Sequence, residues 1–168
     1  MKKVLLLMVA VLMVSSVAMA DHIGVYADAS GASCALASGF NSTATVIHKQ
    51  TAGATGSRFK ITLPAGSNLF AFNTGFTPVG ALGSDLSLGY GQCLSPTIVL
   101  GTIVAILAPG TIYVLPADGF PNIIYTNCSF AELPATGGTA YVLPSNGSCG
   151  EPSATEQSTW GQVKALYR

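Results

Sequence analysis

The 168-residue sequence predicts an all-β protein, an antiparallel β-sandwich of the immunoglobulin-like or jelly-roll-like kind, with a short helical tail at its C-terminus. Runs rich in β-branched and aromatic residues, bounded by Gly, Pro, Asn and Ser, recur roughly every ten residues, a rhythm typical of sandwiches and barrels. Helical periodicity is almost absent before the last stretch of the chain. Charged side chains make up only 8% of the sequence, against about 25% in typical soluble domains. The surface must therefore be covered by Ser, Thr, Asn and Gly, and copies of the chain repel each other weakly.

The N-terminus predicts a secretory signal peptide. Lys2 and Lys3 precede an apolar run from Val4 to Val14, and small residues follow as far as Ala18-Met19-Ala20. A membrane anchor is the alternative, but the apolar run is shorter than the roughly 20 residues that span a bilayer. We expect cleavage after Ala20 and a mature chain that begins at Asp21.

The chain is accordingly divided into a signal peptide at 1–20, a sandwich domain at 21–150, and a polar linker with a Trp-containing tail at 151–168. The mature part keeps five basic and seven acidic side chains, a formal net charge of −2. Because no basic face could follow a phosphate backbone, nucleic acid is a poor partner. No membrane span is expected after cleavage.

Nine segments have the composition and length of strands. They are 22–27, 43–50, 57–63, 68–73, 85–91, 97–107, 111–115, 122–128 and 139–143. The glycine-rich stretch TAGATG lies between the second and third of these and predicts a hairpin that joins them.

Two of these strands differ in how their apolar residues are placed. In 57–63, Phe59, Ile61 and Leu63 alternate with polar residues, which predicts a half-buried antiparallel strand. In 97–107 both faces are apolar, which predicts either a central strand covered on both sides or an interface. The uncharged run from Thr97 to Ala117 could be taken for a membrane helix by length alone. Pro109-Gly110 and the β-branched residues around it favour a strand, a turn and a second strand.

The mature chain has four cysteines, and an even number in an exported protein indicates two disulfides. We expect Cys34 to pair with Cys93 and Cys128 with Cys149, because the second pair brackets one copy of an internal repeat. A metal site is the alternative, but no two cysteines are close enough to form a C-x-x-C knuckle. The sequence therefore predicts neither a metal nor a cofactor.

The internal repeat is a decapeptide, GTIYVLPADG at 110–119 and GTAYVLPSNG at 138–147. Each copy contains a strand former, a proline that ends the strand and a turn signal, D-G or N-G. The two copies have no acid, base or metal-ligating residue in common, so the repeat predicts a structural role and not a binding site. We expect the two copies to flank the strand at 122–128 in one antiparallel sheet.

The tail after Cys149 begins with a polar stretch and ends in STWGQVKALYR. Thr159 is a candidate N-cap for a short helix that places Trp160, Val163 and Tyr167 on one side. So short a helix is not stable alone and needs a surface to dock on, either its own domain or a neighbour. These three residues are the candidate interaction residues.

Four segments together resemble an uncharacterised group of small secreted bacterial proteins with a TWGxIKxLYR-like C-terminus. They are HIGVYADASGASC after the signal peptide, the SRFKITLP strand, GYGQC near the middle and the terminal TWGQVKALYR. The resemblance implies a bacterial protein of the envelope or the extracellular space. It carries no established activity and no catalytic residue.

Catalytic patterns are sparse. His48 is an isolated strand histidine, and His22 would be the second residue of the mature chain, a position suited only to weak copper binding. No G-x-S-x-G elbow is present, and the acidic residues are scattered singly rather than paired as in glycosidases. An enzyme is therefore disfavoured.

Two softer binding patterns remain. Asp118 and Asn122 with nearby carbonyls could form an oxygen cage for calcium, although a simple turn explains the same residues better. Tyr113, Tyr125 and Tyr141 would form a ligand platform if they lay exposed on one sheet face, whereas aromatic residues at strand spacing more often belong to the core.

The favoured function is a secreted structural or interaction module of the cell surface or extracellular matrix, adhesive or self-assembling and without catalysis. The low charge, the strand rhythm and the Trp-containing tail support it, and its partner would be a protein, either itself or a cell-surface partner. The alternative is a secreted domain that binds a glycan or a small ligand, which the tyrosines support.

Overall fold

Twelve strands are present in the part of the chain that a computed structural model describes, residues 21–49, 51–145, 147 and 149. In order they are β1 (His22–Tyr26), β2 (Ala35–Leu36), β3 (Gly39–Lys49), β4 (Ala54–Thr62), β5 (Asn68–Asn73), β6 (Thr77–Ala81), β7 (Asp85–Leu94), β8 (Ile98–Leu107), β9 (Gly110–Leu115), β10 (Ile123–Asn127), β11 (Glu132–Gly137) and β12 (Thr139–Val142). The described residues contain no helix. The predicted signal peptide and the tail at 151–168 lie outside them.

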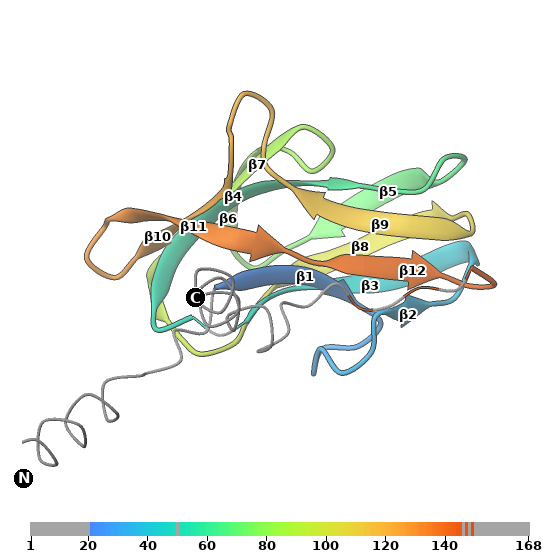
Figure 1. The fold of residues 1–168 in the computed structure, drawn as a ribbon, viewed down its shortest axis with the longest axis horizontal. Helices are drawn as coiled ribbons and strands as arrows, with labels where there is room; N and C mark the ends of the chain where they lie inside the picture. Colours follow the sequence, from blue (N-terminus) through green and yellow to red (C-terminus); the bar gives the residue numbers. More distant parts are fainter. Residues whose placement is uncertain (1–20, 50, 146, 148, 150–168) are drawn as a thin grey trace, which may run out of the picture.

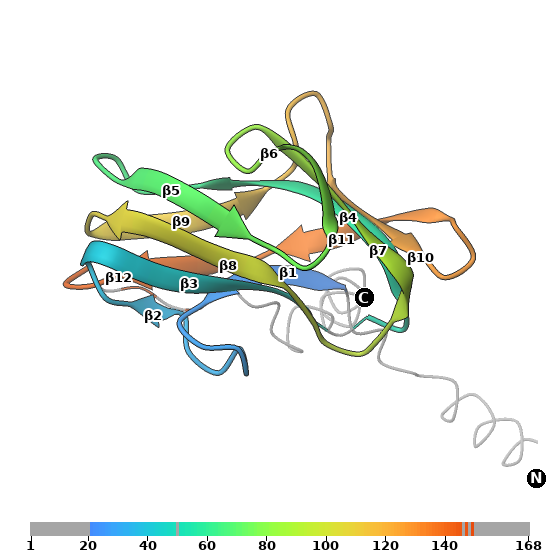
Figure 2. The same cartoon turned by 180° about the vertical axis from the view of Figure 1, so that it is seen from behind.

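The strands form a β-sandwich, as predicted (Figures 1 and 2). One layer has the order β11-β1-β3-β8-β5. The other is centred on β4, which pairs with β7 on one side and with β9 and β10 on the other. Strand β11 joins the layers, because it pairs antiparallel with β10 and parallel with β1. The fold is thus mostly antiparallel, with a second parallel pair between β2 and β12.

The core lies between the layers and contains two of the three side chains predicted from the clearest strand, while the third, Leu63, follows β4 and is partly buried. Phe59 and Ile61 of β4 are buried, whereas Arg58 and Lys60 point outward and are half-buried. Burying each apolar side chain of this kind contributes about 1.5–3 kcal/mol. The segment with the clearest alternation, 57–63, therefore lies largely in β4, the central strand of its layer.

A bulge in β8 accounts for its apolar residues at both even and odd positions, and the strand is not covered on both faces. Val46 pairs with Gly101 and the next residue, Ile47, pairs with Val99, so β8 contains one extra residue at this point. Before the bulge the even-numbered residues Ile98 and Leu100 face the core, and after it the odd-numbered residues do so. The residues of the other face are half-buried or exposed, with Val99 45% exposed. The uncharged run at 97–117 is thus strand, turn and strand, and no helix in the described residues is long and apolar enough to cross a membrane.

The predicted hairpin between 43–50 and 57–63 is wrong. Strand β3 pairs with β1 and β8, and β4 belongs to the other layer, so the glycine-rich stretch between them crosses from one layer to the other. The predicted arrangement of the repeat is also wrong. The two copies pair directly as β9 and β12, with Tyr113 opposite Thr139, while β10 pairs with β4 and β11.

The predicted disulfide connectivity is wrong as well: Cys34 pairs with Cys149 and Cys93 with Cys128. The parallel pairing of β2 and β12 sets Ala35 opposite Tyr141, which brings Cys34 to the chain that follows β12. The ends of β7 and β10 meet because Leu94 and Asn127 both pair with Ala54, one from each side of β4. The sheet order, and not closeness in sequence, therefore selects the partners.

Candidate functional site

One hollow in the described residues lies on the outer face of β4, β7 and β10, and we call it the outer groove. Its volume is about 640 Å³. Arg58, Ile124 and Thr126 line its floor, Phe120 and Phe130 lie along it on loops, and Val79 comes from β6. The Cys93–Cys128 disulfide also contributes to the lining.

Glycines of β7 leave the floor of the outer groove open. A Cβ added at Gly89 or Gly91 would meet no atom within 4 Å, so crowding does not require glycine at either position. Gly91 has a φ of 74°, which favours glycine by itself, whereas Gly89 has no such requirement. The backbone of β7 is therefore accessible to a partner at both positions. Close approach of another chain to a strand backbone is one of the uses of glycine in strands.

Arg58 is held in one orientation in the groove. Its Nε donates to Asp85 Oδ1 at 2.7 Å and its terminal nitrogen donates to the other carboxylate oxygen. The guanidinium carbon lies 3.7 Å from the centroid of the Phe120 ring. The bidentate pair raises the pKa of Arg58 and lowers the pKa of Asp85. Planar guanidinium groups fixed in this way favour specific recognition over non-specific attraction.

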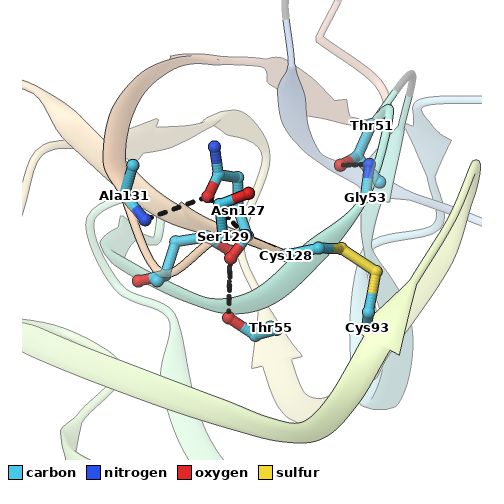
Figure 3. The surroundings of a disulfide bond; sticks show 9 residues. Thr51, Gly53, Thr55, Cys93, Asn127, Cys128, Ser129 and Ala131 are labelled. Carbon is cyan, nitrogen blue, oxygen red and sulfur yellow. Dashed lines mark hydrogen bonds between the residues drawn. A yellow bond between two sulfur atoms is a disulfide. The ribbon is translucent and has the colours of Figure 1, made fainter.

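Phe130 is the most exposed of the large apolar residues that the structure describes, with 80% of its surface accessible. Its φ of 60° lies in the left-handed region, which is rare for a bulky residue without a turn or strain. Asn127 fixes this turn: its side-chain oxygen accepts from the backbone N–H groups of Ser129 and Ala131, each at 2.9 Å (Figure 3). Cys128 anchors the same turn through its disulfide to Cys93, also visible in Figure 3.

The turn therefore keeps the Phe130 ring exposed to water, although the left-handed backbone of Phe130 is energetically unfavourable. Strain of this kind is of the order of 1–3 kcal/mol and clusters at functional positions. The protein stabilises the turn with a disulfide and side-chain hydrogen bonds instead of placing a glycine at residue 130. Neither the exposure of Phe130 nor its backbone conformation is visible in the sequence SFAELP around it.

A second group of polar residues is buried between the layers. The Nε2–H of His48 donates to Asp21 Oδ1 at 3.0 Å, and its Nδ1 accepts from the Tyr90 hydroxyl at 3.2 Å. Burial lowers the pKa of His48 although the Asp21 carboxylate acts against this, and burial with the hydrogen bond to Asp21 raises the pKa of Tyr125 to about 12. His48 is fully buried and Asp21 is 8% exposed, so no substrate reaches the group. Its role is structural: it fixes the first described residue, where the mature chain is expected to begin.

The predicted ligand platform is divided in the structure. Tyr113 and Tyr141 lie on the outer face of the paired strands β9 and β12, and Tyr113 is 44% exposed. Tyr125 points into the core and is 8% exposed. The candidate interaction residues Trp160, Val163 and Tyr167 lie outside the described residues.

The remaining candidates occupy ordinary structural positions. His22 Nδ1 lies 3.1 Å from Thr136 Oγ1, and Lys60 Nζ donates to Asp118. Asn122 is exposed in the loop before β10. Within the described part of the chain, no three His, Cys, Asp or Glu side chains are grouped so that they could hold a metal ion.

Comparison with known proteins identifies a fold but no family. No family model matches the chain, and no curated protein matches it in sequence. The structure is similar to a cohesin module from a Clostridium perfringens family 33 glycoside hydrolase, with a TM-score of 0.53 and 7% identity over 74% of this chain and 96% of that one. It is similar to a non-cellulosomal cohesin from the hyperthermophilic archaeon Archaeoglobus fulgidus, with a TM-score of 0.53 and 12% identity over 74% of this chain and 91% of that one. The chain therefore has a cohesin-like β-sandwich fold.

Proposed function

We propose that the chain is a secreted, non-catalytic interaction module that binds a partner protein through the outer groove. The observation that carries the proposal is Phe130, a bulky apolar ring held exposed in a left-handed turn at the groove. Aromatic residues and Arg are enriched among the residues that dominate binding energy at protein interfaces. Phe120 stacked on the fixed Arg58 supplies a second anchor of the same kind.

The chemistry of the groove favours binding over catalysis. Its lining contains no histidine, and its two cysteines are joined in a disulfide, so neither a cysteine thiolate nor a histidine base is available in the groove. The buried Asp21–His48–Tyr90 group contains a histidine, which the groove lining lacks, but this group is closed to solvent. The cohesin-like fold supports the same proposal, although one of the similar modules belongs to a glycoside hydrolase.

The proposed location is the bacterial cell surface or the extracellular matrix. The predicted signal peptide and the resemblance to small secreted bacterial proteins support export. Two disulfides join all four cysteines, and disulfides persist in oxidising compartments.

A second candidate function, glycan or small-ligand binding, is favoured by one observation. Tyr113 and Tyr141 share the outer face of β9 and β12, so a sugar ring could stack there. A glycan array separates the two candidates: protein binding through the groove predicts no signal that depends on Tyr113. A sugar signal that disappears in Tyr113→Ala would favour the second candidate.

Site-specific photo-cross-linking in the secreting cells tests the proposed function. We expect a photoreactive phenylalanine at position 130 to give one defined protein adduct, and the same residue at position 113, a matched exposed aromatic site on β9, to give none. The adduct should weaken when Arg58 is replaced by alanine. Absence of an adduct at 130, or the same adduct at both positions, would contradict binding through the groove.

A further inference from the structure

Strand β5 forms an unprotected edge of the sandwich (Figure 2). It pairs only with β8, so the backbone groups on its other side have no strand partner in the described residues. Its sequence, NLFAFN, contains no charge and no proline. Natural edge strands are normally protected by charged side chains, proline or very short length, because an open edge is a template for another strand.

The other edges of the described sheet carry such protection. Strand β2 has only two residues, and β6 contains Pro78 and a glycine at a φ of 91°. The one feature of β5 that can protect an edge strand is a bulge. Leu69 pairs with Ala105 and Ala71 pairs with Val104, so Phe70 has no opposite residue on β8. This bulge displays an apolar side chain instead of hiding the edge, because Phe70 is 47% exposed.

An apolar surface continues from this edge. The Phe40 ring of β3 is 75% exposed and packs against Phe70 with ring centroids 5.7 Å apart. Strands β5 and β8 carry no charged side chain, and the one lysine of β3, Lys49, donates to the Gly31 carbonyl at 2.7 Å. A partner on this surface therefore meets an uncharged edge, and two copies of it would not repel each other.

We infer that β5 pairs antiparallel with β5 of a second copy of the chain. A two-fold interface requires that the same segment be complementary to itself. The sequence NLFAFN meets this requirement through its bulge. In a regular strand a two-fold axis would set one residue opposite itself, because neighbouring side chains face opposite sides, but the bulge at Phe70 interrupts this alternation. A two-fold axis between Phe70 and Ala71 then sets Asn68 opposite Asn73, Leu69 opposite Phe72 and Phe70 opposite Ala71. Every pair is then polar with polar or apolar with apolar, and the layer β11-β1-β3-β8-β5 continues into its copy.

This inference deepens the self-assembling part of the proposed function and rests on it, but it uses a different surface from the outer groove. Phe70 and Phe130 are therefore matched test positions, since both are exposed phenylalanines and they lie on different surfaces. A single edge strand buries a modest area, so we expect a weak, concentration-dependent dimer.

Sedimentation of the purified mature protein from about 1 µM to about 1 mM tests the inference, a range that covers weak dissociation constants. We expect a monomer–dimer equilibrium whose dissociation constant rises at least tenfold in Phe70→Lys and is unchanged in Phe130→Lys. A monomer throughout, or equal effects of the two variants, would overturn the pairing. Loss of partner cross-linking at residue 130 with an intact dimer would instead overturn the groove proposal alone.

Cysteine cross-linking tests the register independently. Opposite residues of antiparallel strands lie about 4.5–5.5 Å apart between Cα atoms, within disulfide range. A mixture of Asn68→Cys and Asn73→Cys proteins should therefore form a mixed disulfide on mild oxidation. Each variant alone should not, because identical positions are five residues out of register, about 17 Å at 3.4 Å per residue. Cross-linking of Asn68→Cys to itself would exclude the proposed register, in which residue 68 lies opposite residue 73.

Discussion

Replacing Cys34 and Cys149 with alanine should destabilise the domain more than removing the other disulfide. The residues of this pair are 115 positions apart, against 35 for Cys93 and Cys128. In the chain-entropy treatment, these loops correspond to about 4.8 and about 3.8 kcal/mol at 25 °C. Since the shorter loop lies inside the longer one, its closure leaves 115 − 35 = 80 residues for the outer disulfide, or about 4.5 kcal/mol.

Urea unfolding of the two double-alanine variants measures both free energies of unfolding directly. We expect Cys34→Ala/Cys149→Ala to lose about 0.7 kcal/mol more than Cys93→Ala/Cys128→Ala. A non-reducing peptide map of the wild type supplies the control for connectivity. A smaller loss for the outer pair than for the inner pair, or a Cys34–Cys93 peptide in the map, would refute the reasoning.

Three further predictions concern single positions. Burial lowers the pKa of His48 below its usual 6.5, so the folded protein binds fewer protons than the unfolded chain as the pH falls below 6.5. The urea midpoint should fall between about pH 7 and pH 5, and His48→Gln should remove this slope. Phe130→Gly should keep or raise the melting temperature, because it removes the strain of a non-glycine residue in the left-handed region, about 1–2 kcal/mol. This gain offsets the extra backbone entropy that glycine loses on folding. A clear loss of stability would argue against strain at this position. Gly53→Ala should lower stability by about 1–3 kcal/mol, since its φ is 150° and a Cβ would lie 2.5 Å from the Cys128 sulfur; an unchanged melt would contradict this.

The sequence predicted the strands better than their partners. Alternation in β4 was sufficient to assign Phe59 and Ile61 to the core, because side-chain direction in a strand is a local property. Strands β6 and β11 were missed since Pro78 and Pro134 lie inside them, and proline argues against a strand on local grounds. Tertiary pairing tolerates both prolines.

Pairing and disulfides depend on the order of strands across the sheet, which local patterns do not contain. Both copies of the repeat form a strand, as predicted, and the first copy ends in the predicted turn, whereas Asn146 of the second turn lies outside the described residues. The two copies pair with each other and not with the strand between them. The candidate site was less predictable still. The exposure of Phe130 depends on the conformation of one turn, which the sequence around it does not reveal. Tyr125, a member of the possible ligand platform, lies in the core, the position that strand spacing favoured for such aromatic residues.

The affinity of the purified mature protein for the partner cross-linked at residue 130 tests the central claim most directly. Calorimetric titration should be made with the wild type and with Phe130→Gly, the variant that we expect to keep the fold. If Phe130 is an interface anchor, its removal costs at least about 2 kcal/mol, so the account predicts a dissociation constant raised roughly 30-fold or more. An unchanged dissociation constant would contradict the claim that the outer groove is the binding surface.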